Sequence, residues 1–392
     1  MGDLRDPTPG ATTPLEAART PAFDRVAGSG LFGLIHTIPE GLPPGSDVGN
    51  LSLFGYDPKV YYTGRSPLEA AAMGVDLAPE DVAFRMNLVT LDGAAGGDTM
   101  ADYSAGHIDS DQAGRIVEDL AGHLSQEAVQ FYPGVSYRHL MVWRKGLDGM
   151  ETTPPHDILG QPVAGYFPRG EGAETLCRIM TESRKWLAGH PVNKERAAAG
   201  QPPVSQVWFW GQGRAPSIPT FADMHGLRGA CISAVDLVRG VAVYAGFKIL
   251  HVPGATGYID TDYAAKGVHA LKALEDHDLV FVHVEAPDES GHMGSREEKI
   301  RAIESIDALI VAPLLDKLPQ LGPFKLLITS DHATPVSLRT HTPDPVPFAM
   351  ATGEQLSRQA TPVKYGEAQA KAGGVVIREG HGIVEKLIAY GT

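Results

Sequence analysis

The chain has 392 residues, of which 43% are hydrophobic and 20% are charged, and its formal net charge is -14. This length predicts two domains, and the ordinary globular composition excludes a disordered or fibrous protein. The acidic balance opposes non-specific attraction to nucleic acid or to an anionic membrane, so a small anionic substrate requires a local basic pocket.

Cysteine usage and the N-terminus indicate a cellular compartment. Cys177 and Cys231 lie far apart and outside any CxxC spacing, which argues against a disulfide framework and a thiolate zinc site. The first residues, MGDLRDPTPG, lack the basic and apolar segments of a secretory signal, and no run approaches the roughly 18 apolar residues of a membrane-spanning helix. We therefore expect a cytoplasmic protein.

The N-terminal region carries a candidate nucleophile. After a helix start at Thr13, the segment PEGLPPGSDVGNLSLFGYDP predicts a tight turn that presents Ser46 at the beginning of a helix. A hydroxyl there can be deprotonated by a metal and attack phosphorus, while the helix N-terminus receives the anion. An ordinary N-cap serine is the alternative. Arg65, in YTGRSP, suits a phosphate fork, or else is a surface arginine.

The composition of the sequence changes between about Asp76 and Ser217, where Pro, Gly and His are more frequent and apolar runs are shorter. We predict an inserted α+β domain over residues 77–217, with residues 1–76 and 218–392 forming the core domain. The segment GQGRAPSIPT predicts a hinge at its exit. Four basic residues of the insert lie in turn-rich contexts and can bind a carboxylate or phosphate, although each also reads as a solvated loop residue: His107, Arg138, His156 and Arg214.

Downstream of residue 228, strand-like apolar runs alternate with segments of helical period. This alternation predicts an α/β fold with a mostly parallel sheet and helices on both faces. Ligands usually bind beyond the carboxyl ends of such strands. Two segments rich in chemical groups fall there, because EAPDESGH follows LVFVHV and DHATP follows KLLIT.

These segments contain candidate metal ligands. Asp288 and His292 stand one helical turn apart, adjacent Asp331 and His332 follow a strand, and His341 returns in the loop RTHTPDPVPF. Each reads singly as a solvated residue or a helix cap. As a set, two carboxylates and three imidazoles suit zinc or manganese, and two metals close together can clamp the entering and leaving oxygens of a phosphoryl group.

A lysine between these segments is a further candidate. Lys266, in GYIDTDYAAKG, can neutralise the transferring phosphoryl oxygens. A lysine on the surface of a helix is the alternative.

Eight segments taken in chain order resemble the archaeal-type, cofactor-independent phosphoglycerate mutases of the alkaline phosphatase superfamily. They are PEGLPPGSDVGNLSLFGYDP, YTGRSPLEAA, DYSAGHI, GVSYRHL, GATGYIDTDY, EAPDESGH, TSDHATP and HTPDPVPF. The resemblance implies an alkaline-phosphatase-like core, an inserted substrate-closing domain and two divalent metal ions, Mn²⁺ or Zn²⁺. It also implies interconversion of 3-phosphoglycerate and 2-phosphoglycerate in glycolysis and gluconeogenesis, through a phosphoserine at Ser46.

The resemblance further assigns the ligands. Asp288, His292 and His341 resemble one metal's ligands, and Asp331, His332 and Ser46 resemble part of the other's. Arg65, Arg214, Lys266 and His107 match positions near the substrate.

One departure concerns the start of the chain. Family members begin with an apolar strand that ends in Asp-Gly, whose Asp binds the second metal, whereas this sequence begins at Met1-Gly2-Asp3. We therefore expect that this strand lies upstream of Met1.

Two other functions remain open from the sequence. The segment AGHPVNKERAAAGQPP resembles a bacterial branch of proposed homoserine kinases, and an inactive homologue would follow if the first strand were truly absent. We expect a small phosphorylated substrate and neither nucleic acid nor membrane as partner; homo-oligomers are compatible with the sequence.

Overall fold

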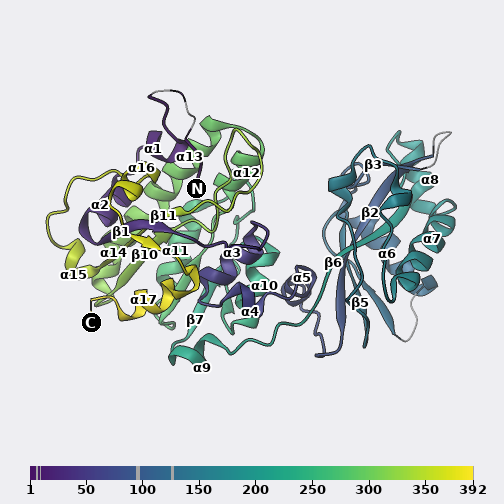
Figure 1. Ribbon diagram of the computed structural model, residues 1–392, viewed down its shortest axis with the longest axis horizontal. Helices are drawn as coiled ribbons and strands as arrows, with labels where there is room; N and C mark the ends of the chain where they lie inside the picture. Colours follow the sequence, from purple (N-terminus) through teal and green to yellow (C-terminus); the bar gives the residue numbers. More distant parts are fainter. Residues whose placement is uncertain (6–7, 9, 94–97, 125–127, 392) are drawn as a thin grey trace. The chain divides into compact units, whose positions relative to one another are not determined.

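The computed structural model describes residues 1–5, 8, 10–93, 98–124 and 128–391, and the chain divides into two compact units (Figure 1). Unit 1 comprises Met1–Tyr62 and Ser217–Thr392, and unit 2 comprises Thr63–Pro216. The first boundary lies before residue 63 rather than after residue 76, because helix α5 (Ser66–Ala72) packs on the strands of unit 2. Within the described ranges, no helix combines the length and apolarity needed to cross a membrane.

Unit 1 contains short strands interleaved with helices. Its elements before the insertion are α1 (Pro14–Ala17), α2 (Pro21–Ser29), β1 (Leu31–Ile35), α3 (Ser46–Leu53) and α4 (Pro58–Tyr61). After it follow α9 (Phe221–His225), β7 (Gly229–Ile232), α10 (Asp236–Tyr244), β8 (Lys248–Ile249), α11 (Tyr263–Ala273), β9 (Leu279–Val282), α12 (Ala286–His292), α13 (Arg296–Ile306), the π-helical turn η3 (Asp307–Val311), α14 (Ala312–Lys317), η4 (Leu318–Gln320), β10 (Lys325–Thr329), β11 (Val346–Thr352), α15 (Gly353–Leu356), α16 (Glu367–Ala372), β12 (Val376–Ile377), η5 (Gly380–Gly382) and α17 (Ile383–Ala389).

The strands of unit 1 form two separate sheets. One has the order β8-β7-β9 and is entirely parallel, whereas the other has the order β10-β11-β1-β12. In the second sheet only β1 and β12 are parallel, and β11 runs antiparallel to both β10 and β1. The sequence correctly predicted an α/β unit, but a single mostly parallel sheet was wrong for the described residues.

The two ends of the chain pack together in unit 1, where the purple N-terminal helices lie beside green α13 and yellow α16 in Figure 1. Helix α1 begins as the sequence predicts, because Thr13 and Glu16 form a capping box and Pro14 occupies the first turn. The Glu16 carboxylate also accepts a hydrogen bond from the main chain of Ala368 at 3.1 Å. The N-terminal segment is thus fixed against the C-terminal one.

Unit 2 is an α+β unit built on one antiparallel sheet. Its strands are β2 (Val82–Asp92), β3 (Thr99–Asp102), β4 (Val129–Tyr132), β5 (Arg138–Trp143) and β6 (Gln206–Arg214), and its other helices are α6 (Ser110–Leu124), η1 (Pro155–Ile158), η2 (Val163–Gly165), α7 (Ala173–Leu187) and α8 (Pro191–Ala198). The long strand β2 is central and pairs with β3, β5 and β6. The two ends of the unit meet, because the Thr63 hydroxyl donates a 2.7 Å hydrogen bond to the Arg214 carbonyl.

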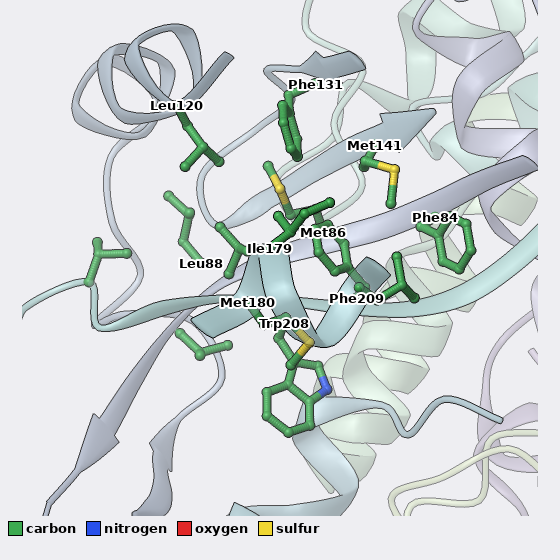
Figure 2. Close-up of a cluster of buried hydrophobic side chains, with 14 of the residues drawn as sticks. Phe84, Met86, Leu88, Leu120, Phe131, Met141, Ile179, Met180, Trp208 and Phe209 are labelled. Atoms are coloured by element: carbon green, nitrogen blue, oxygen red, sulfur yellow. The ribbon is translucent and has the colours of Figure 1, made fainter. Parts of the chain in front are cut away.

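The sheet of unit 2 has two different faces. On one face, β2 contributes alternate apolar residues such as Phe84 and Met86 to a core with α6 and α7, and Figure 2 shows these side chains converging. On the other face, Ala83 packs with Leu140, Val142 and Ala70 of α5. The second face also carries Arg85 of β2, which pairs with Glu69 of α5.

Candidate functional site

Three segments of unit 1 bring the predicted metal ligands together. Helix α12 starts four residues after β9 and carries Asp288 and His292 one turn apart. Asp331 and His332 directly follow β10, and the loop that leaves them returns His341 to the same place. The strand ends position these groups, as the sequence predicted.

One group of candidate ligands surrounds the Asp288 carboxylate. Its Oδ2 lies 3.1 Å from Nε2 of His292, and its Oδ1 lies 3.4 Å from Nε2 of His341. The two imidazole Nε2 atoms are themselves 2.9 Å apart. Two ring nitrogens at this distance share one proton or one cation, so the donor set fits a divalent metal.

Ser46 lies at a second group of candidate ligands. Gly45 is the N-cap of α3, so Ser46 occupies the first helical turn, where its side chain is buried. Its Oγ lies 3.1 Å from Nε2 of His332, and the same nitrogen lies 3.4 Å from Oδ2 of Asp331. Asn50, one turn further along α3, donates to that Asp331 oxygen and to the Ser46 carbonyl, each at 2.8 Å. The asparagine thereby ties the serine helix to the ligand after β10.

The two groups are joined. Ligand atoms of Asp288, His332 and His341 all lie within 4.8 Å of one another. Thr334 connects them as well, because its hydroxyl donates a hydrogen bond to Asp288 Oδ1 and lies 3.2 Å from Nδ1 of His332. His332 therefore stands between the two expected ligand sets.

The electrostatic environment of these two groups of residues favours the ionised form of the Asp288 and Asp331 carboxylates. Burial opposes ionisation of Asp288, but hydrogen bonds with His292 and His341 hold its pKa well below the usual range. Burial likewise opposes ionisation of Asp331, yet the charge of His332 keeps the pKa of Asp331 lowered. The hydrogen bond to Asp288 raises the pKa of His292 to about 9, whereas burial lowers the pKa of His332. The carboxylates are thus available as anionic ligands.

Lys266 lies beside this centre in a buried environment. Its Nζ donates a 3.1 Å hydrogen bond to the His283 carbonyl, and burial lowers its pKa to about 8. Nearby, burial and the charges of Asp288 and Asp331 raise the pKa of Glu285 well above its usual range. The residues between β9 and α12 therefore add titratable groups that the sequence analysis did not single out.

Unit 2 carries a basic cluster, defined here as Arg65, Arg85, Arg138, His107 and His156. Arg85 of β2 is buried, pairs with Glu69 of α5 at 2.9 Å and lies 4.8 Å from the ring centroid of Trp210. Arg65 reaches the same two partners, at 3.5 Å from Glu69 and 5.9 Å from the Trp210 ring. Two guanidinium groups thus share one carboxylate and leave a positive excess, which suits an anionic ligand.

The other members of the basic cluster surround these arginines. The His156 ring packs against Trp210 and Tyr103, and its pKa is lowered, by burial first and then by the charges of Arg65 and Arg85. Arg138 and His107 both contact the Tyr137 ring. Aromatic rings therefore separate and orient the cationic groups.

Arg214, by contrast, is engaged elsewhere. Its guanidinium donates to both carboxylate oxygens of Asp148 and to the carbonyls of Glu80 and Gly146. These bonds use its donors to hold loops of unit 2, and the structure does not bring it to the basic cluster. Its place near the substrate stays a prediction.

Two residues absent from the sequence-based set belong to these groups. Arg85 is the one charge in the apolar run VAFRMNLVTL, and a charge in a buried strand requires a partner. Asn50 follows Ser46 at helical spacing, but nothing in the sequence indicated its bond to Asp331.

Comparisons with known proteins agree on one activity. A sequence model of the family described as 2,3-bisphosphoglycerate-independent phosphoglycerate mutase matches residues 27–193. A probable enzyme of this name from Geobacter sulfurreducens is 51% identical over 379 residues, which span 97% of this chain and 95% of the relative. The enzyme of this name from Methanosarcina acetivorans is 52% identical over 344 residues, or 87% and 85% of the two chains. The identity extends across both units.

Two solved structures are similar to this chain over nearly its whole length. A protein from Pyrococcus horikoshii has a TM-score of 0.82 at 30% sequence identity, with 99% of this chain and 94% of that chain covered. A cofactor-independent phosphoglycerate mutase from Thermoplasma acidophilum has a TM-score of 0.65 at 26% identity, with 100% and 97% covered.

Proposed function

Because this chain belongs to the 2,3-bisphosphoglycerate-independent phosphoglycerate mutases and interconverts 3-phosphoglycerate and 2-phosphoglycerate, we propose that Ser46 carries the phosphoryl group between the two glycerate hydroxyls. The comparisons favour this activity over that of a homoserine kinase. The observation that supports Ser46 is its buried hydroxyl 3.1 Å from His332, among ligands drawn from three segments. The fold of unit 1 is then of the alkaline phosphatase type.

We propose that two divalent cations bind in unit 1. Asp288, His292 and His341 hold one, and Asp331, His332 and Ser46 contribute to the other. Mixed nitrogen and oxygen ligands suit manganese or zinc. Such cations supply Lewis-acid charge that lowers the pKa of a serine hydroxyl and neutralises phosphoryl oxygens.

The chain's own residues act in two mirrored steps. Ser46 Oγ gives up its proton and forms a bond to phosphorus as the bond from phosphorus to one glycerate oxygen breaks, and that oxygen takes up a proton. In the second step the other glycerate hydroxyl loses a proton and attacks, and Ser46 is regained. Protonated Lys266 offsets the negative charge of the transferring group. No bisphosphoglycerate is consumed.

Between the two steps the phosphoserine must not meet water. We propose that unit 2 binds the carboxylate and the remaining oxygens of the substrate through Arg65, Arg85, Arg138 and His156, and so retains the glycerate while it reorients. Two arginines that share Glu69 provide the uncompensated positive charge that this role needs.

The test is capture of the intermediate. The manganese-loaded chain is incubated with 3-phosphoglycerate, quenched in acid and analysed by peptide mass spectrometry. We expect phosphate on Ser46, and we expect Ser46→Ala to lower turnover by roughly 10⁴-fold or more. Ser52→Ala is the matched control, since Ser52 is a buried serine of the same helix that bonds to the Thr37 carbonyl. Normal turnover of Ser46→Ala, or phosphate on another residue, would remove Ser46 from the mechanism.

A further inference from the structure

The indole ring of Trp210 contacts three of the five members of the basic cluster. Trp210 of β6 lies opposite Arg85 of β2 in the antiparallel ladder, and the ring centroid is 4.8 Å from Cζ of Arg85. Cζ of Arg65 lies 5.9 Å from the same centroid. The His156 ring packs against the indole at 5.3 Å between centroids, with 74° between the two planes. One neutral side chain therefore connects two guanidinium groups and an imidazole.

The two guanidinium groups need such a contact to stay together. Arg65 and Arg85 carry like charges and share the one carboxylate of Glu69. The pKa of Arg85 is lowered to about 10, by burial first, with a further contribution from the charge of Arg65 that outlasts the opposing effect of Glu69. A cation beside the face of an indole ring is attracted to it, so the ring holds both groups where their charges alone would drive them apart.

A buried asparagine fixes the indole ring in turn. Asn87 follows Arg85 by two residues on β2, so the two side chains leave the same face of the sheet, and Asn87 is only 1% exposed. Its Oδ1 accepts a 3.0 Å hydrogen bond from Nε1 of Trp210, and its Nδ2 donates a 3.1 Å hydrogen bond to the Tyr103 carbonyl. Rotation of either group would leave a buried polar atom unpaired, which is costly. The Tyr103 ring in turn contacts the His156 ring at 6.0 Å.

We propose that Trp210, held by Asn87, is a positioning residue that orients the cations of the basic cluster for the anionic substrate. Neither residue needs to touch the substrate in this role. The indole N–H matters as much as the ring face, because its hydrogen bond to Asn87 decides where the face lies. This inference rests on the proposed binding of the substrate by the basic cluster and adds two residues to it.

The experiment is a double-mutant cycle on the full, manganese-loaded chain with 3-phosphoglycerate as substrate. Trp210→Phe keeps an aromatic face but removes the donor, and Asn87→Leu removes the acceptor at similar volume. We expect each change to raise KM by about fivefold or more, with kcat within about twofold. The double variant should have a KM no higher than the worse single variant, since either change breaks the same bond.

Trp186→Phe is the matched control. Trp186 packs against the rings of His123 and His190, which lie outside the basic cluster. This change should leave KM unchanged even if it lowers Tm.

The pKa of His156 gives a second measurement that loss of stability alone would not move. It is lowered by burial first and then by the charges of Arg65 and Arg85, against the effect of Asp157. In Trp210→Phe the guanidinium groups are no longer held beside the imidazole, so this pKa should rise toward 6.5 in an NMR titration of labelled histidine. Trp186→Phe should leave it unchanged.

The outcomes separate this inference from the function on which it rests. An unchanged KM in Trp210→Phe would overturn the inference alone if Arg85→Met still raises KM. An unchanged KM in both variants would remove the basic cluster from substrate binding and the inference with it. Effects that multiply in the double variant, or a constant His156 pKa, would also overturn it, because the asparagine and the indole would then act separately or not on the cations. If Trp210→Phe does not fold, Asn87→Leu is judged by the same KM and pKa criteria.

Discussion

Lys299 of α13 fixes the N-terminal residues to the loop after β10, so its removal should destabilise unit 1. The side chain is fully buried, and its three ammonium donors reach Asp3 Oδ2 at 2.9 Å, the Gly2 carbonyl at 2.9 Å and the Thr334 carbonyl at 2.7 Å. Lys299→Met leaves a buried carboxylate and two carbonyls without this partner. Breaking a buried ion pair in this way costs roughly 3–5 kcal/mol of the free energy of unfolding.

The effect is measurable as a change in Tm. For a unit of this size, 1 kcal/mol corresponds to a shift of about 2–4 °C, so Lys299→Met should lower the Tm of unit 1 by about 6–20 °C. Lys371→Met is the control, because Lys371 is an exposed helical lysine of the same unit. Asp3→Asn combined with Lys299→Met should recover part of the loss, since no buried charge then remains. A Tm for Lys299→Met within 2 °C of the control, which is about 1 kcal/mol or less, would refute this reasoning.

Three further predictions concern single side chains. His292→Ala should weaken manganese binding by about 100-fold or more in a metal-buffered titration, whereas exposed His251→Ala should leave it unchanged; equal affinities would contradict the ligand assignment. Arg85→Met should raise KM for 3-phosphoglycerate by about 10-fold or more without lowering bound metal, and an effect no larger than that of Arg115→Met, at an exposed ion pair, would argue against a role in substrate binding. Burial lowers the pKa of His139 to about 3, below the 6.5 of an unfolded chain. Its neutral form therefore stabilises unit 2 fully above pH 6.5, and this contribution is lost as the pH falls toward 3. In thermal melts from pH 4 to 8, the Tm of His139→Gln should depend less on pH than that of the unchanged chain.

The arrangement of the candidate metal ligands could be predicted from the sequence because strand ends and helical spacing determine it. Asp288 and His292 share one face of a helix, and Asp331 and His332 leave a strand at the same edge. The turn before Ser46 predicts a helix that starts at this serine, and α3 begins at Ser46 in the structure.

Other features depended on tertiary pairing that the sequence pattern does not encode. Arg85 appeared to be part of an apolar strand, and only its contact with Glu69 explains a buried guanidinium. Arg214 is a candidate by its chemistry and its turn-rich segment, but its ion pair with Asp148 could not be predicted from the sequence. The division into two sheets was also not predicted, because apolar runs predict strands without specifying their neighbours.

The meeting of the two ends of unit 2 bears on how such a chain can arise. Thr63 and Arg214 are joined by a hydrogen bond although 150 residues lie between them. A segment whose two ends lie side by side can be inserted into a folded chain without moving the residues on either side of it. A single gene insertion can therefore supply an entire domain while the order of the surrounding helices and strands is kept. The candidate metal ligands and the residues of the basic cluster can therefore have different evolutionary origins within one gene.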